Sequence, residues 1–207
     1  MESHSKKHNT RKRKLLIMLS CVCFALLAVF LYDSSKIGKQ IDGYKGVPVY
    51  HNGILYTRSH GRNYSDSDYY YGQKWQCVEY IKRFYDQALH HQMPDVYGNA
   101  IDFFDLSVGH GQLNERRGLI QYMNGENMPP QPDDLLVFTD SRYGHVAIIT
   151  EVTEKDIEVI QQNILGKPRD RLSLIMENDQ FIVEGKRKPI AWLRLKEAQT
   201  VPIRRYD

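Results

Sequence analysis

The spacing of hydrophobic positions changes from helical to alternating between the first and the second half of the chain. Apolar residues recur at helical spacing at Val78, Ile81, Phe84, Tyr85, Ala88 and Leu89. This pattern predicts an amphipathic helix of about three turns that starts near Cys77. A weaker helical pattern covers residues 100–107. A Pro-rich loop at 124–134 then ends the helical half.

Short apolar runs in the second half predict strands. They lie at 135–139, 145–151, 157–162, 172–176, 180–183 and 190–195. Asn178-Asp179 is a typical hairpin turn, and the polar segment 59–68 predicts a surface loop. Helices followed by consecutive antiparallel strands indicate an α+β fold class, in which the sheet packs on the leading helix. The 207 residues suffice for one such domain.

The N-terminal region predicts a membrane anchor. Residues 15–32 contain no charge, and eighteen apolar residues are near the lower limit for a membrane-spanning helix. The basic residues 11–14 precede this run, so we expect the N-terminus to stay cytoplasmic and the body to be exported. The run ends at Tyr32 without a small-residue cleavage site, which favours an uncleaved signal anchor over a cleaved signal peptide.

These features predict a domain organisation. It comprises a basic cytoplasmic tail at 1–14, a transmembrane signal anchor at 15–32, a linker at 33–42, a catalytic domain at 43–197 and a C-terminal tail at 198–207.

The charge distribution argues against nucleic-acid binding. Residues 1–14 contain six Lys and Arg and one Glu, so the net positive charge of this segment is larger than the formal net charge of +3 for the whole chain. The remainder is therefore slightly acidic, whereas a nucleic-acid-binding domain concentrates basic residues on its folded body.

A single cysteine and a downstream histidine are the candidate chemistry. Cys21 and Cys23 lie in the apolar run, so Cys77 is the only thiol in the body and has no partner there for a disulfide. A lone cysteine with a histidine elsewhere in the sequence is typical of a cysteine hydrolase. Cys77 opens a predicted helix, whose unpaired N–H groups favour a thiolate, and an imidazolium at His145 would favour it further.

Structural explanations exist for the same residues. Buried, inert cysteines are common, and a histidine that leads an apolar strand is more often structural. His90, His91 and His110 lack the further ligands at set spacing that a structural zinc site needs, so we expect no metal and no cofactor.

Five motifs in order resemble the CHAP family (cysteine, histidine-dependent amidohydrolases/peptidases), and most of all its glutathionylspermidine amidase domains. The motifs are Gly46-Val47-Pro48-Val49-Tyr50, Tyr71 to Tyr80 (YGQKWQCVEY), Asp133-Asp134-Leu135-Leu136, Gly144 to Val152 (GHVAIITEV) and Gln162-Asn163. The resemblance covers roughly residues 43–195. It implies a papain-like (NlpC/P60-type) fold, which agrees with the α+β layout.

The resemblance also implies roles for individual residues. Cys77 would be the nucleophile and His145 its base, while Gln76 and the backbone N–H of Cys77 would stabilise the oxyanion. The family usually has Glu-Gln-Asn on the next strand, and this chain has Gln161-Gln162-Asn163. An amide can fix the tautomer of His145 but supplies no charge, and Asn163 could share this orienting role.

Residues near the cysteine are candidates for substrate binding. Related amidases tend to have arginine five residues after the cysteine, where this chain has Lys82, which lacks bidentate geometry. Trp75 and Tyr71 are further candidates, although packing explains Tyr71 equally well.

Three functions fit the sequence. The first is an exported, membrane-tethered cysteine amidase or peptidase, with cell-wall (peptidoglycan) peptides as the expected substrate and the membrane contacted through 15–32. The second keeps the enzyme and changes the substrate to glutathionylspermidine or a related amide. The third is a non-catalytic, papain-like binding module, for which Gln161 is the main support.

Overall fold

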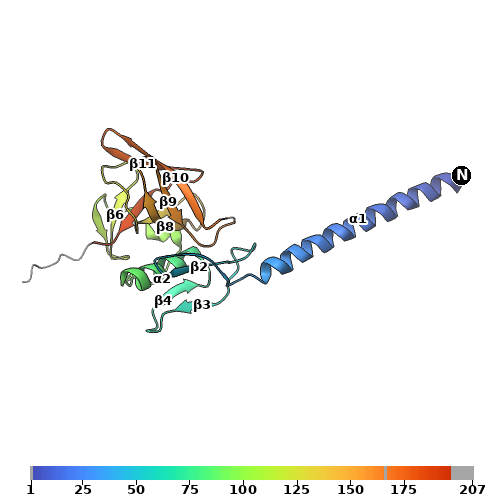
Figure 1. Ribbon diagram of the computed structural model, residues 1–207, viewed down its shortest axis with the longest axis horizontal. Helices are drawn as coiled ribbons and strands as arrows, with labels where there is room; N and C mark the ends of the chain where they lie inside the picture. The colour runs from blue at the N-terminus through green and yellow to red at the C-terminus, as the bar shows by residue number, and fades with distance from the viewer. Residues whose placement is uncertain (1, 166, 197–207) are drawn as a thin grey trace, which may run out of the picture.

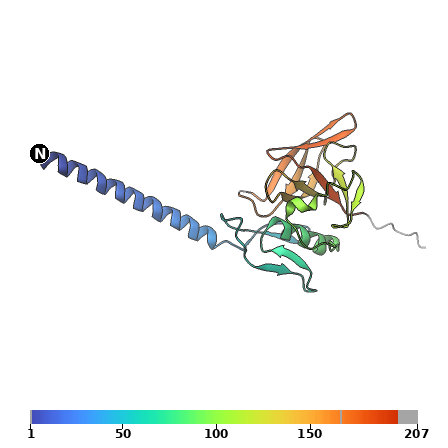
Figure 2. The same cartoon turned by 180° about the vertical axis from the view of Figure 1, so that it is seen from behind.

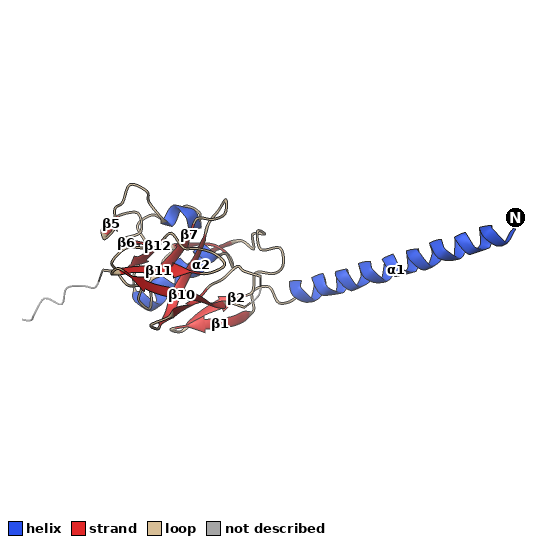
Figure 3. Ribbon diagram, turned by 90° about the horizontal axis from the view of Figure 1, so that it is seen from above, coloured by secondary structure: helices blue, strands red, loops and turns tan. Residues whose placement is uncertain are grey.

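The computed structural model describes residues 2–165 and 167–196, and it consists of one long helix followed by an α+β domain (Figure 1). The predicted C-terminal tail, 198–207, lies outside the described residues. Helix α1 (Glu2–Ser34) extends away from the domain, with no other described helix or strand alongside it (Figure 3). Its window Lys12–Ser34 has a mean hydropathy of 2.8 and none of it is buried. This length and composition fit a membrane-spanning helix or a signal sequence.

Two small hairpins that the sequence did not predict precede the helix that begins with Cys77. Strands β1 (Gln40–Tyr44) and β2 (Val47–Tyr50) pair in antiparallel fashion, and β3 (Arg62–Tyr64) pairs with β4 (Tyr70–Gln73). The prediction that helices lead and strands follow was therefore wrong for this part of the chain. β3 also lies in the expected loop 59–68, and β1 begins inside the expected linker 33–42.

The predicted helices are present with different lengths. Helix α2 (Cys77–Leu89) begins at the cysteine as predicted and ends at His90, which adopts a left-handed conformation with φ +53°. The weaker helical stretch is one short 3-10 helix, η1 (Ala100–Phe103), which opens with an Asn99–Asp102 capping box.

An antiparallel sheet of eight strands forms the bulk of the domain (Figures 1 and 2). In chain order its strands are β5 (Gln112–Asn114), β6 (Leu119–Met123), β7 (Leu135–Phe138), β8 (His145–Val152), β9 (Asp156–Ile160), β10 (Arg169–Glu177), β11 (Gln180–Glu184) and β12 (Ala191–Arg194). Their spatial order is β11-β10-β9-β8-β7-β12-β6-β5. The six predicted strands are confirmed, with ends shifted by at most three residues. The turn at Asn178 and Asp179 is confirmed too, because both have positive φ.

One face of the sheet packs on α2. Ile81, Phe84 and Tyr85 are completely buried against sheet residues such as Val146 and Ile148. The amphipathic pattern of the helix thus places its apolar face on the strand that begins with His145. This packing positions the cysteine end of α2 beside the start of β8.

The other face encloses a second core and makes the sheet bend. Trp192 of β12 and Val183 of β11 belong to one buried cluster, although four strands separate β11 from β12 in the sheet. Asn124, just after β6, closes the bend. Its side chain donates to the carbonyl of Val183 (3.0 Å) and accepts the N–H of the same residue (2.8 Å). The edge strand β11 is therefore covered by the chain itself.

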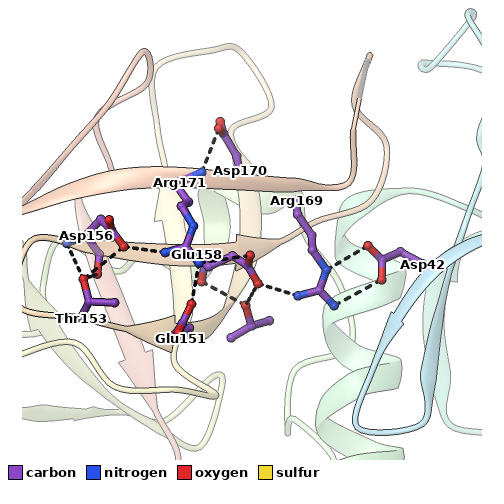
Figure 4. Close-up of polar contacts among 9 residues, drawn as sticks. Asp42, Glu151, Thr153, Asp156, Glu158, Arg169, Asp170 and Arg171 are labelled. Atoms are coloured by element: carbon purple, nitrogen blue, oxygen red, sulfur yellow. Dashed lines mark hydrogen bonds and ion pairs between the residues drawn. The ribbon is translucent and has the colours of Figure 1, made fainter.

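Ion pairs join the first hairpin to the main sheet (Figure 4). Arg169 of β10 donates to Asp42 of β1 (2.9 Å) and to Glu158 of β9 (2.6 Å), and a third bond reaches the carbonyl of Gly43. Arg171 makes a parallel set of contacts with Glu151 and Asp156 at the surface.

Removing the Arg169 guanidinium should loosen the first hairpin. Because this side chain is one-third exposed, Arg169→Met should lower the free energy of unfolding by about 1 kcal/mol. Arg171→Met is the matched control on the same strand, and its half-exposed pairs should contribute less. Thermal unfolding of the full chain in detergent micelles would measure both, and equal effects would contradict the bridging role of Arg169.

Candidate active site

Cys77 lies at the first residue of α2 and is half-buried. The chain enters the helix through Trp75, which has a left-handed φ of +62° that non-glycine residues rarely adopt. Strand β4 approaches the first turn closely, because a Cβ at Gly72 would lie 3.2 Å from the Cα of Glu79. These two features direct the start of the helix, and with it the thiol, towards the main sheet.

Gly144 allows the strand of His145 to begin at the right place. A Cβ at Gly144 would lie 2.6 Å from the backbone nitrogen of Ile101 and 2.7 Å from the carbonyl oxygen of Phe138, and the residue has φ +69°. A glycine is therefore required here by the tight packing of the turn between η1 and β7.

Cys77 lies close to the start of β8, the strand that begins with His145. The backbone N–H of Val146, the residue after His145, favours the thiolate and so acts to lower the pKa of Cys77. His145 is 5% exposed, and its Nε2 lies 2.8 Å from Oε1 of Gln161. An amide oxygen only accepts, so Nε2 carries the proton and Nδ1 of the neutral ring is left as the acceptor.

Burial opposes charge on both groups. Burial raises the pKa of the Cys77 thiol, although the backbone N–H groups of Val146, Val78 and Cys77 act in the opposite direction. Burial also lowers the pKa of His145 to about 4; the hydrogen bond that the ring donates to Gln161 opposes this shift, and the Arg187 guanidinium adds to it. At neutral pH the surroundings therefore favour a neutral thiol beside a neutral imidazole. The expected lowering of the thiol pKa by the helix start is outweighed by desolvation.

A buried carboxylate in the first turn of α2 connects three segments of the chain near Cys77. Glu79 is fully buried and accepts hydrogen bonds from Arg83 (2.6 Å), Gln162 (2.7 Å) and Asn63 (2.8 Å). Gln162 also donates to the carbonyl of Gln76 (3.0 Å). The residue before the nucleophile is thereby tied to the segment that follows β9. From the sequence, Glu79 and Arg83 read as an ordinary surface pair, and nothing local indicated the other partners.

Gln76 and Asn163 have partners different from those expected. The Gln76 amide donates to the carbonyls of Tyr56 (3.0 Å) and Arg58 (3.3 Å), so neither N–H points freely at an oxyanion. Asn163 lies beyond the end of β9 with φ +64°, and its amide contacts Gln76 (2.5 Å) and Asn52 (2.5 Å) rather than His145. The expectation that Asn163 shares the orienting role assumed a continuous strand, which ends at Ile160. Gln161 alone has that contact.

Two of the three candidate substrate contacts are buried. Lys82 is 1% exposed, donates to the carbonyl of Val96 (2.7 Å) and lies over the rings of Tyr69 and Tyr70. Burial lowers its pKa to about 8. Tyr71 is 3% exposed and donates to Asp86 (2.5 Å). Both residues are bonded within the domain, and their role in substrate binding stays a prediction.

Trp75, the remaining candidate for substrate binding, is accessible, and so are Arg187 and Asp140. Trp75 is partly exposed and its ring packs on Tyr50, with centroids 4.2 Å apart. Arg187 pairs with Asp140 near His145 and was not foreseen from the sequence, because the two residues are 47 positions apart. Within residues 2–165 and 167–196, no group of three or more His, Cys, Asp or Glu is arranged to hold a metal ion.

Comparison with known proteins assigns this region to a family. The model of the CHAP domain matches residues 67–163, which include Cys77, His145 and Gln161. The chain is 32% identical over 137 residues to bifunctional glutathionylspermidine synthetase/amidase from Escherichia coli (strain K12), with 59% of this chain and 22% of that protein aligned. It is 30% identical over 129 residues to trypanothione synthetase from Crithidia fasciculata, with 60% and 20% aligned. The chain thus spans about a fifth of the length of these curated relatives.

A carboxylate in place of Gln161 should favour the charged forms of His145 and Cys77. Gln161→Glu would put a negative charge at hydrogen-bond distance from Nε2 of His145. The pKa of His145 should rise, and the imidazolium should in turn lower the pKa of Cys77. In the native chain we expect the pH midpoint of Cys77 alkylation to lie above that of a free thiol. In Gln161→Glu we expect this midpoint to fall by about one to three units.

Iodoacetamide labelling followed by mass spectrometry of the Cys77 peptide measures this midpoint separately from Cys21 and Cys23. Gln161→Leu is the control, because it removes the acceptor without adding charge. If the midpoint is unchanged in Gln161→Glu, the carboxylate does not act on His145 and the assigned contact is incorrect.

Loss of the buried carboxylate should destabilise the domain strongly. Glu79→Ala leaves Arg83 buried without its charge partner, which should lower the free energy of unfolding by about 3–5 kcal/mol. The double variant Glu79→Ala/Arg83→Met should recover part of that loss. Thermal unfolding against Glu154→Ala, an exposed glutamate, provides the comparison. Equal stability of the two single variants would contradict the role of Glu79.

Proposed function

We propose, from the match of residues 67–163 to the CHAP domain family, that this chain is a cysteine-dependent amidohydrolase or peptidase that uses Cys77 and His145. The family match supports a hydrolase that acts on amide bonds. The observation that carries the assignment of residues is that α2, which begins with Cys77, packs on β8, which begins with His145, and that Gln161 holds the His145 ring.

The arrangement suits general-base catalysis from a neutral pair. Nδ1 of His145 accepts the thiol proton as the Cys77 sulfur attacks the amide carbonyl carbon. The C–N bond then breaks, the imidazolium returns its proton to the leaving amine, and an acyl-thioester stays on Cys77. Water, deprotonated by His145, attacks the thioester and releases a carboxylic acid and the free thiol.

Backbone donors at the helix start replace Gln76 in stabilising the oxyanion. The N–H groups of Cys77 and Val78 lie in the first turn, face the sulfur and have no partner within the helix. Negative charge developing beside Cys77 would accept hydrogen bonds from them and would be favoured by the helix dipole.

Gln161 would act as a positioning residue. Its oxygen holds Nε2–H of His145 and so keeps Nδ1 unprotonated in the resting enzyme. It supplies no negative charge to the imidazolium that forms during the reaction. This arrangement resembles the asparagine of papain-like proteases and should give a lower rate than a carboxylate at the same place.

The apolar helix α1 supports a location for the domain, and this location supports a class of substrate. Helix α1 is long and apolar enough to cross a membrane, and its basic start favours a cytoplasmic N-terminus with the domain on the extracytoplasmic side. In a bacterium, cell-wall peptides would be the abundant amide substrate there. The alternative substrate, glutathionylspermidine, is supported by the named activity of the relatives.

Substitution of the nucleophile tests the proposal. Cys77→Ala should abolish amide hydrolysis by the full chain in detergent, and His145→Ala should lower kcat at least a hundredfold, since general-base catalysis contributes about that much. Amine release from peptidoglycan peptides and from glutathionylspermidine would be measured in parallel, with thermal unfolding as the control for folding. Hydrolysis retained by folded Cys77→Ala would refute the mechanism.

A further inference from the structure

A loop between β2 and β3 exposes consecutive apolar side chains. Ile54 is 42% exposed, Leu55 53% and Tyr56 48%. Beyond α1, no other three consecutive large hydrophobic residues are exposed in the part of the chain that the structure describes. Scattered exposed apolar residues are normal, whereas a contiguous group indicates a contact surface. We call residues 53–58 the apolar loop.

Hydrogen bonds fix the apolar loop to the end of α1. The carboxylate of Asp33 accepts the backbone N–H of Ile54 (2.8 Å) and contacts Nε2 of His51 (2.7 Å). Gly53 leaves no room for a side chain, because its Cβ would lie 3.1 Å from the side chain of Ile37. A shallow hollow between the two segments is lined by Phe30, Ile37, Ile54, Leu55 and Arg58, among others. The loop therefore continues the apolar surface of the helix.

The residues around this surface have the chemistry of a membrane interface. Lys36 lies 4.1 Å from the ring centroid of Tyr32 at the end of the apolar run. Lys39 is exposed soon after α1, and Arg58 is exposed in the apolar loop, where it lines the hollow. Tyrosine, lysine and arginine concentrate at the boundary between acyl chains and headgroups, where the cations meet lipid phosphates.

The backbone of the same loop is bonded to the segment that precedes Cys77. The carbonyl of Tyr56 accepts hydrogen bonds from Gln76 (3.0 Å) and Asn52 (3.0 Å), and Gln76 precedes the nucleophile. One hydrogen bond thus separates the loop backbone from the residue that begins α2.

We propose that the apolar loop inserts into the headgroup region of the bilayer that α1 crosses, so that the Cys77 site is held at the membrane surface. The proposal rests on the membrane tether stated under Proposed function and adds a second point of contact. A flexible tether would let the domain turn freely, whereas two contacts fix one face towards the lipid. The substrates within reach are then amides close to the bilayer surface.

Quenching of tryptophan fluorescence by brominated lipid tests the proposal. The full chain is reconstituted in phosphatidylcholine vesicles, with and without bromine in the acyl chains near the headgroup. Leu55→Trp is compared with Met176→Trp, an exposed position on β10 of the main sheet, and quenching of the parent chain, which carries Trp75 and Trp192, is subtracted. We expect at least twofold stronger quenching at position 55, and likewise for Ile54→Trp.

Equal quenching at positions 55 and 176 in chains that float with the vesicles would overturn the docking and leave the tether and the hydrolase intact. Chains that do not float would overturn the tether and the docking together. Amide hydrolysis measured on the same vesicles tests the proposed reaction separately, because none of the three substituted positions belongs to the catalytic machinery.

Discussion

The burial of one carboxylate, that of Glu79, determines where the nucleophile lies. A charge removed from water is stable only when it is paired and hydrogen-bonded, and Glu79 meets this need with groups from three separate segments: Arg83 of its own helix, Asn63 of β3 and Gln162 after β9. Satisfying the carboxylate therefore fixes the first turn of α2 between the small hairpin and the main sheet. The position of Cys77 relative to His145 is a consequence of this constraint.

Local patterns in the sequence predicted what local interactions determine. The apolar periodicity of α2 and the six strands from β7 to β12 were predicted within a few residues, because each buries a regular face. In the strands β1 to β6 the apolar residues are interrupted by polar residues, glycine or proline, so no apolar run marks them in the sequence. Lys82 was named from the resemblance alone, and its burial depends on Val96 and on the rings of Tyr69 and Tyr70. The contacts of Gln162 and Asn163 join segments 83 to 112 residues apart, and no local pattern encodes them.

An amide beside the histidine changes the resting state of the pair. With the neutral amide of Gln161 at the His145 ring, the hydrogen bond to Gln161 and the charge of Asp140 oppose the effect of burial only in part, and the ring stays neutral down to acidic pH. His145 then becomes positively charged only while Cys77 attacks a substrate carbonyl. The negative charge that develops on the carbonyl oxygen lies next to the N–H groups at the start of α2. Such a site is less reactive towards external oxidants and alkylating agents, because the thiolate is the reactive form.

The last described strand also determines when the domain can fold. β12 (Ala191–Arg194) lies inside the sheet between β7 and β6, and its Trp192 is fully buried in the second core. Until these residues leave the ribosome, β6 and β7 have no partner between them, and both hydrophobic cores stay open. Folding of the domain therefore needs strands that are far apart in the sequence to be available at the same time. A polypeptide that crosses a membrane as it is synthesised would do so without its finished sheet and would acquire its active site only on the far side.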